Sequence, residues 1–213
     1  MSGSSSARDR VQALVAVLGE HFGPLPWWRA PPEEVMIGAI LVQQTRWENA
    51  ERALEELRGA GLLSLEAIDR APAEAIEEAV HCAGFFRVKT RRLKALARFV
   101  LGTFGSIEGM VNAPTDELRR GLLGVPGIGE ETADAILCYA FDRCSFVIDA
   151  YTRRLCACAR VEEPAEGYRG LFEAVLSREN AGYRQTHAHI VEYGKRYCSR
   201  RRCEECSIRS SDA

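Results

Sequence analysis

Apolar residues recur along most of the chain at intervals of three and four, which is the spacing of one face of an α-helix. Glycine or proline follows or precedes most of these stretches, as expected at helix ends. The stretches are residues 9–22, 33–44, 49–61, 64–71, 72–84, 89–105, 116–123, 130–141, 168–180 and 185–198. Only CSFVID (144–149) resembles a strand, and no period-two alternation or fixed-length repeat occurs. The pattern therefore predicts an all-α fold.

Composition narrows the class of protein. A chain of 213 residues with 46% hydrophobic content is long enough for one or two domains with real cores. No apolar run approaches 18 residues, and MSGSSSARDR (1–10) lacks the apolar core of a signal peptide. We therefore expect a disordered tail over 1–10, no membrane association and a cytoplasmic location. The eight cysteines then suggest metal ligands or core positions rather than disulfides.

The stretch VPGIGEETADAIL (125–137) places one proline and two glycines directly before a helix. A helix precedes it, so the segment 115–140 reads as helix, tight turn, helix. Gly127 and Gly129 permit positive φ and close backbone approach, and Pro126 stiffens the turn. The second helix presents free N–H groups, which form an anion site suited to a DNA phosphate. An ordinary helical hairpin is the alternative, but the whole pattern favours DNA.

The motifs LLGVPGIGEETADAIL and FVIDAYTRRL, followed by a C-terminal cysteine cluster, resemble the endonuclease III superfamily of DNA glycosylases. In these proteins a helix-hairpin-helix is followed by a Gly/Pro-rich loop and an aspartate. The resemblance implies two helical domains that flank a DNA-binding cleft. Residues 31–143 would form a six-helix barrel, and residues 11–30 with 144–213 a second domain. It further implies a monomer that binds double-stranded DNA and flips out a damaged base.

The family's catalytic aspartate matches Asp149. A fixed carboxylate there would stabilise positive charge on the sugar and orient water, although Asp149 could equally cap the following helix. Family members that also nick DNA carry a lysine where this chain has Glu131, and none of the three lysines lies in the hairpin. We therefore expect a monofunctional enzyme, which leaves an abasic site for a separate endonuclease. Glu130 and Glu131 also suit the positive end of the helix dipole.

The tryptophans suggest the substrate. LPWWRAPPEE and AILVQQTRWENA resemble the 3-methyladenine glycosylase branch, in which aromatic residues line the base pocket, so Trp27, Trp28 and Trp47 are its candidates. Electron-rich indole faces attract a cationic alkylated purine, while burial in a core is the alternative for each. Mismatch adenine glycosylases need an acid at the position of Ala39. Its absence also favours a cationic base, which leaves readily.

The resemblance assigns further residues. Gln44 matches the residue that fills the gap left by the flipped base, and His189 lies near the place of a modified lysine in the alkylpurine branch, with His187 close by. The alternative for Gln44 is a polar residue at a helix end that bonds to the backbone. The alternative for each histidine is a structural role. DNA-backbone contacts are expected from the hairpin and the helix after Asp149, and a monovalent cation could bind the hairpin. These contact residues are Val125, Gly127, Gly129, Thr132 and Arg153.

The C-terminal cysteines, Cys198, Cys203 and Cys206, are close enough in sequence to indicate a metal site. The resemblance implies a [4Fe–4S] cluster in a basic loop that contacts DNA. The family spacing is C-x6-C-x2-C-x5-C, whereas this chain has C-x4-C-x2-C and Asp212 at the fourth position. Asp212 or water could be the fourth ligand, or the site could hold zinc or be degenerate. The other five cysteines, among them Cys158, read as core positions.

The net charge of −2 does not by itself indicate binding to nucleic acid, although the stretches FFRVKTRRLK and GKRYCSRRRC are locally basic. The sequence predicts a monofunctional glycosylase for alkylated purines, acting on DNA in the nucleoid. Two alternatives stay open: a glycosylase for uracil, mismatched thymine or an oxidised base, and a non-catalytic helix-hairpin-helix DNA-binding protein. A simple iron–sulfur or zinc protein is a fourth reading, which metal analysis would test.

Overall fold

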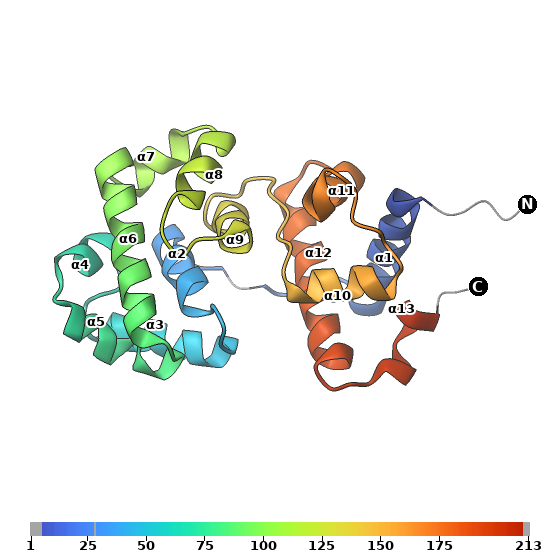
Figure 1. Ribbon diagram of the computed structural model, residues 1–213, viewed down its shortest axis with the longest axis horizontal. Helices are drawn as coiled ribbons and strands as arrows, with labels where there is room; N and C mark the ends of the chain where they lie inside the picture. Colours follow the sequence, from blue (N-terminus) through green and yellow to red (C-terminus); the bar gives the residue numbers. More distant parts are fainter. Residues whose placement is uncertain (1–5, 28, 211–213) are drawn as a thin grey trace, which may run out of the picture. The chain divides into compact units, whose positions relative to one another are not determined.

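The computed structural model describes residues 6–27 and 29–210, and this part of the chain is helical with no strand (Figure 1). It divides into two compact units, unit 1 with Met1–Trp28 and Cys144–Ala213, and unit 2 with Arg29–Arg143. Unit 1 is therefore built from both ends of the chain, whereas unit 2 is continuous.

Unit 2 is arranged around α6, which contacts α2, α4, α5 and α7. Figure 1 shows α6 as the long green helix with the shorter helices around it. The apolar face of α6 is buried, and so are six of the ten residues of α2. The elements of unit 2 are α2 (Pro32–Leu41), α3 (Trp47–Gly59), α4 (Leu65–Arg70), α5 (Ala73–Ala79), η1 (His81–Ala83), α6 (Phe86–Phe104), α7 (Ile107–Asn112), α8 (Thr115–Leu123) and α9 (Glu130–Ala140).

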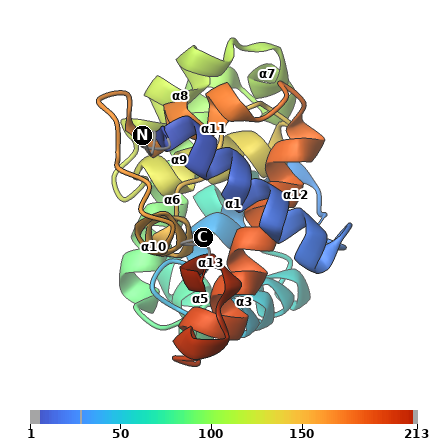
Figure 2. The same ribbon diagram turned by 90° about the vertical axis from the view of Figure 1, so that its right-hand side faces the viewer.

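In unit 1, α1 packs against α11 and α12, as Figure 2 shows. The core includes Phe146 and Phe172, whose rings stack 4.4 Å apart. A π-helical turn continues α12 without a break. The elements of unit 1 are α1 (Ala7–Phe22), α10 (Ala150–Cys158), α11 (Gly167–Val175), α12 (Asn180–Tyr193), the π-helical turn η2 (Gly194–Cys198), η3 (Cys203–Glu205) and α13 (Ser207–Ser210).

Two local expectations differ from the structure. Residues 6–10, expected within a disordered tail, form the cap and first turn of α1, because Ser6 and Asp9 make a reciprocal capping box. The strand-like segment 144–149 has no regular secondary structure. Its apolar side chains are nevertheless buried, with Phe146 and Val147 inaccessible to solvent, which explains its hydrophobic run.

None of the helices in the described residues has the length and apolar character needed to cross a membrane.

Candidate functional site

The hairpin of α8 and α9 is held by a buried ion pair. Arg119 on α8 donates two hydrogen bonds to the carboxylate of Asp134 on α9, at 2.8 and 3.0 Å, and a third to Glu130 at 3.3 Å. Such paired contacts are stronger and more directional than single ones. They raise the pKa of Arg119, against the effect of burial. The hairpin is therefore a stiff unit whose turn has a defined shape.

The two turn glycines have different roles. Gly127 has φ +90°, and a Cβ there would lie 2.3 Å from Nε of Arg92. Gly129 is the N-cap of α9 with φ −94°, so only Gly127 adopts the positive φ that both glycines permit, and a Cβ on Gly129 would meet open space. Both glycines are exposed, and within the described part of the chain neither N–H group makes a hydrogen bond. These donors are therefore available to an anion.

The loop after α2 is tied to the turn by Gln43, the neighbour of the predicted residue Gln44. The Gln43 amide donates to the carbonyl of Gly127 at 3.1 Å and to the hydroxyl of Thr132 at 3.0 Å, and its own oxygen accepts from Arg92. Thr132 is buried and engaged within the protein. The backbone N–H of Val125 is used inside the turn, at 3.0 Å from the carbonyl of Leu122.

Gln44 and Phe85 are exposed residues of unit 2 with a left-handed backbone, as is Asp142. Gln44 has φ 56° and Phe85, the residue before α6, has φ 47°. Phe85 is 63% exposed, which is unusual for an aromatic side chain in a strained conformation. Lys89 links both segments, because its buried ammonium donates to the carbonyls of Leu41 at 2.8 Å and Ala83 at 2.7 Å.

In unit 1, Asp149 is the N-cap of α10. Its Oδ1 accepts from the backbone N–H of Thr152 at 2.7 Å and from the Thr152 hydroxyl at 2.8 Å. Its Oδ2 lies 3.7 Å from Nε2 of His187 on α12. Burial alone would raise the pKa of Asp149, but His187 and Thr152 outweigh it, so the pKa is lowered. The structure thus holds a buried carboxylate in its charged form.

An aromatic side chain stands next to this pair. The Trp27 ring packs edge to face against His187, with centroids 6.3 Å apart. Trp27 is only half-buried. Asp149, His187 and Trp27 therefore form one cluster, in which a charged carboxylate, an imidazole and an indole adjoin.

The model of the HhH-GPD superfamily of base excision DNA repair proteins matches residues 37–177. The chain belongs to this superfamily. It is a DNA glycosylase of base excision repair by family and fold.

Individual relatives agree with this assignment. A protein of Methanocaldococcus jannaschii named as a DNA repair glycosylase is 36% identical, over 94% of each chain. Endonuclease III of Thermotoga maritima is 27% identical, over 84% of this chain and 81% of its own. The H. pylori 3-methyladenine DNA glycosylase, solved with 1,N6-ethenoadenine, superposes with a TM-score of 0.75 at 28% identity, covering 90% of this chain and 98% of its own.

The remaining predicted residues of this glycosylase have the following surroundings. His189 is buried, with Nε2 2.7 Å from the carbonyl oxygen of Gly23 and its ring stacked on Phe22. This contact joins α12 to the end of α1 and gives His189 a structural role, so its place in a base pocket stays a prediction. Arg153 is exposed and pairs with Glu163 at 3.3 Å. Trp47 begins α3 in unit 2, and Trp28 lies outside the described residues.

All three lysines of the glycosylase are engaged away from the hairpin. Lys89 is almost fully buried, and Lys94 donates to three backbone carbonyls, the shortest bond being 2.7 Å to Ala71. Lys195 pairs with Glu192 at 2.8 Å. Burial lowers the pKa of Lys89 to about 8, with a further effect from Arg92. A lowered pKa is typical of nucleophilic lysines, but its carbonyl partners and burial keep Lys89 from substrate.

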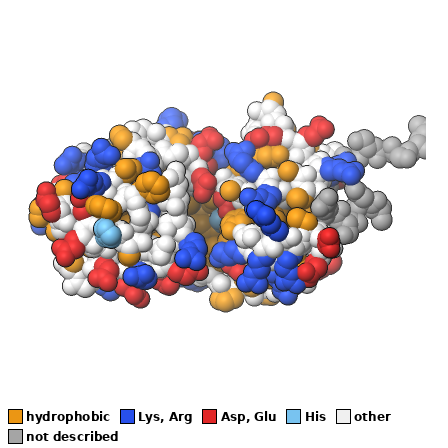
Figure 3. Space-filling view, turned by 60° about the horizontal axis from the view of Figure 1, so that its bottom comes forward, with side chains coloured by type: hydrophobic (Ala, Val, Ile, Leu, Met, Phe, Trp, Pro, Cys, Tyr) orange, Lys and Arg blue, Asp and Glu red, His pale blue; other side chains and the backbone are white. Residues whose placement is uncertain are grey.

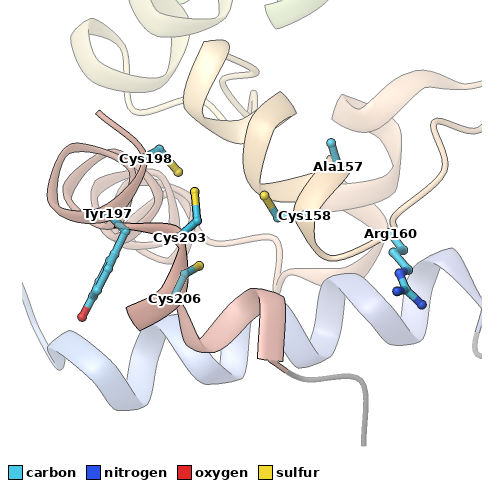
Figure 4. Close-up of a pocket in the computed structure, with 7 residues that line it drawn as sticks. All are labelled: Ala157, Cys158, Arg160, Tyr197, Cys198, Cys203 and Cys206. Carbon is cyan, nitrogen blue, oxygen red and sulfur yellow. The ribbon is translucent and has the colours of Figure 1, made fainter. Parts of the chain in front are cut away.

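The C-terminal cysteines border a cavity of about 310 Å³ in unit 1. Its lining is Ala157, Cys158, Arg160, Tyr197, Cys198, Cys203 and Cys206 (Figure 4). Burial raises the pKa of the Cys198 thiol, and the nearby Cys158 raises it further, while Arg154 opposes them. Among the described residues, no three histidine, cysteine or acidic side chains are gathered closely enough to hold a single metal ion. Asp212 lies outside the described residues.

The sequence pointed to Asp149, the hairpin and the three C-terminal cysteines, but not to four other residues. Gln43 lies next to Gln44, and Phe85 directly follows the expected helix 72–84, but neither residue belongs to a recognisable motif. His187 was noticed only as a neighbour of His189, and its place beside Asp149 depends on how α10 and α12 pack. Cys158 lies in an apolar helix, so the sequence predicted that it is a core residue. The one available signal was its spacing of seven residues from Tyr151, which places both on one helix face.

Proposed function

We propose that this glycosylase is monofunctional and removes an alkylated purine such as 3-methyladenine from double-stranded DNA. The product is an abasic site, which a separate endonuclease must process. The observation that carries the proposal is the buried, charged carboxylate of Asp149 beside His187 and Trp27.

Asp149 supplies the chemistry of bond cleavage. The bond between the sugar and a cationic alkylated purine breaks with both electrons going to the base, so the base leaves neutral and the sugar becomes positively charged. The Asp149 carboxylate stabilises this charge, and water adds to the sugar carbon and gives up a proton. One oxygen of Asp149 is committed to Thr152, while Oδ2 faces His187. Oδ2 is therefore the oxygen available to orient the water.

The aromatic residues support the choice of base. Trp27 adjoins the Asp149 and His187 pair and is half-buried, so part of its ring can meet a ligand. A cationic purine gains from contact with an indole face, and a flipped base stacks on aromatic side chains. The H. pylori relative is named for 3-methyladenine and was solved with a modified adenine. Trp47 of unit 2 and Trp28, which lies outside the described residues, stay candidates for contact with the base on the strength of the sequence resemblance alone.

The engagement of the lysines supports the absence of lyase activity. Strand cleavage through a Schiff base needs a free amine that reaches the sugar. The position expected for it holds Glu131, which is exposed on the first turn of α9. Endonuclease III relatives are nevertheless part of the superfamily, so the product must be examined directly.

DNA contacts are proposed on both units. On unit 2, Gly127 and Gly129 are exposed, and their N–H groups would suit a phosphate, while exposed Gln44 would fill the space of the flipped base. Phe85 is a second exposed candidate for contact with bases. On unit 1, Figure 3 shows Lys and Arg side chains gathered on one face. Exposed basic residues of unit 1 include Arg153, Arg154, Arg160, Lys195, Arg196, Arg200 and Arg201.

The test is base release from duplex DNA that contains 3-methyladenine and 7-methylguanine, with strand breaks scored before and after hot alkali. Release of 3-methyladenine with breaks only after alkali is expected. Breaks without alkali would refute the monofunctional assignment. Release only from uracil, mismatched thymine or oxidised substrates would refute the alkylpurine assignment, and binding without any release would refute the enzyme.

The variant Asp149→Asn separates catalysis from helix capping. Asparagine caps helices as well as aspartate does, so α10 and the melting temperature should change little. Loss of the charge should lower single-turnover base release by at least about 100-fold. An Asp149→Asn protein with full activity would remove Asp149 from the mechanism.

A further inference from the structure

Four cysteines from distant parts of the sequence border one cavity in unit 1. Three come from the C-terminal segment, and Cys158 comes from the last turn of α10. Figure 4 shows the sulfur of Cys158 directed toward the space between Cys198, Cys203 and Cys206. The sequence pattern had left this segment one cysteine short of four ligands.

The packing of α10 fixes the direction of Cys158. Tyr151 lies two helical turns before Cys158 on the same face, and its hydroxyl lies 3.1 Å from that of Ser199. Its ring packs on Gly194, where a Cβ would lie only 2.2 Å from the ring. Gly194 and Cys198 are the two ends of the π-helical turn. The face of α10 that carries Cys158 is thus held against the turn that carries Cys198.

The cavity suits a group larger than one ion. Zinc binds thiolates at about 2.3 Å, which brings four sulfur atoms to within about 4 Å of one another. The described side chains contain no such gathering, and the four cysteines instead surround a space of about 310 Å³. Four thiolates around a space of this kind fit an iron–sulfur cluster.

The lining of the cavity includes polar groups beside the four sulfur atoms. Arg160 is one of the lining residues. The Tyr193 hydroxyl donates to the sulfur of Cys206 at 3.5 Å. Hydrogen bonds of this kind orient metal ligands and tune the metal.

We infer that Cys158 is the fourth thiolate ligand of a metal centre formed with Cys198, Cys203 and Cys206, and that its occupant is an iron–sulfur cluster. This ligand set replaces Asp212, which the sequence spacing suggested. It does not depend on the proposed substrate, and the cluster takes no part in base removal. Its role is to hold the basic C-terminal segment on α10.

The deciding experiment compares three variants with the unaltered protein, all purified without oxygen. Cys158→Ser removes the inferred ligand, Asp212→Ala removes the alternative, and Cys156→Ala is the control on the same helix, because Cys156 is a buried core residue outside the cavity. Iron, sulfide and zinc per chain and visible absorption are measured. We expect about four irons per chain in the unaltered protein, Asp212→Ala and Cys156→Ala. Cys158→Ser should lose at least one quarter of the iron and change the spectrum.

Several results would overturn the inference. Full iron and an unchanged spectrum in Cys158→Ser would exclude Cys158 as a ligand, as would loss of iron in Asp212→Ala alone. Zinc in place of iron would overturn the cluster. No DNA is involved, so a metal-loaded protein that releases no base would refute only the proposed function.

A second measurement avoids variants that fail to fold. The unaltered protein is treated with a thiol alkylating agent before and after chelation of its metal, and each cysteine is followed by mass spectrometry. We expect Cys158 to become reactive upon chelation together with Cys198, Cys203 and Cys206. Equal labelling of Cys158 in both samples would contradict its role as a ligand.

Discussion

At the residue scale, Asp149 is the N-cap of α10 and the proposed catalytic carboxylate, two roles that sequence could not separate. Its two oxygens have different surroundings, because Oδ1 caps α10 through Thr152 and Oδ2 faces His187. Capping thus fixes the position of the carboxylate. The same arrangement lowers its pKa although the group is buried. The cap of α10 and the proposed catalytic group are therefore the same side chain.

The role of His187 can be tested through pH dependence. His187→Gln removes an interaction that lowers the pKa of Asp149 and leaves the effect of burial, so that pKa should rise. The acid limb of kcat/KM for base release should then move to higher pH, because protonation of Asp149 removes the catalytic charge.

The control for this variant is His81→Gln, since His81 is exposed in unit 2. It should keep the pH profile of the unaltered protein. An identical acid limb in His187→Gln and the unaltered protein would show that His187 does not position the charge of Asp149.

At the element scale, the hairpin turn is held rigidly by side-chain contacts, while its two glycines are exposed to solvent. The ion pair of Arg119 and Asp134 fixes α8 against α9, and Gln43 fixes the loop after α2 to the turn. Gly127 is needed for the shape of the turn, while Gly129 leaves room outside it. The two glycines should respond differently to substitution.

Gly127→Ala should lower the free energy of unfolding by about 1–3 kcal/mol, because alanine disfavours positive φ and its Cβ would meet Arg92. Gly129→Ala should cost less than about 1 kcal/mol but weaken DNA binding, since its methyl group would occupy the approach to the N–H groups. Urea unfolding and binding to an abasic-site duplex measure the two effects. Equal DNA affinity of Gly129→Ala and the unaltered protein would contradict the phosphate site.

Lys89 connects two segments, the end of α2 and the end of η1, through its buried ammonium. Burial lowers its pKa to about 8 in the folded protein, from 10.5. The unfolded chain therefore binds more protons between these values, so this group makes stability increase with pH across that range. The free energy of unfolding of the unaltered protein, relative to Lys89→Met, should rise by up to roughly 3 kcal/mol from pH 8 to 10.5.

Urea unfolding of both proteins at several pH values measures this difference. The matched control is Arg87→Met, because Arg87 is an exposed residue near the start of α6. A difference that stays constant with pH would show that Lys89 keeps its ordinary pKa in the folded protein.

At the scale of the whole molecule, unit 1 is discontinuous in sequence. Its core joins α1 at the beginning of the chain to α12 near the end, through contacts such as His189 with Gly23. The inferred metal centre lies wholly within unit 1, between α10 and the C-terminal segment. Unit 2 has its own core and carries the hairpin. Loss of metal should therefore affect one unit.

Hydrogen exchange tests this difference between the units. Removal of metal by a chelator should speed exchange in residues 150–158 and 194–208, because thiolate bonds no longer tie these segments together. Exchange in α6 and α9 of unit 2 should stay the same. A uniform change over both units, or none, would contradict a metal centre confined to unit 1.

The sequence by itself determined the helices, because their apolar period and their glycine and proline ends are local properties. It also determined the hairpin and led to the prediction of Asp149 as the catalytic residue, since these residues form continuous motifs. Tertiary structure alone decided which side chains meet across elements. His187 reaches Asp149 only because α10 packs on α12. Lys89 bonds to the end of α2 and to the end of η1 only because α6 packs against both elements. Cys158 read as core because its helix is apolar, and only the docking of Tyr151 on Gly194 turns it toward the other cysteines.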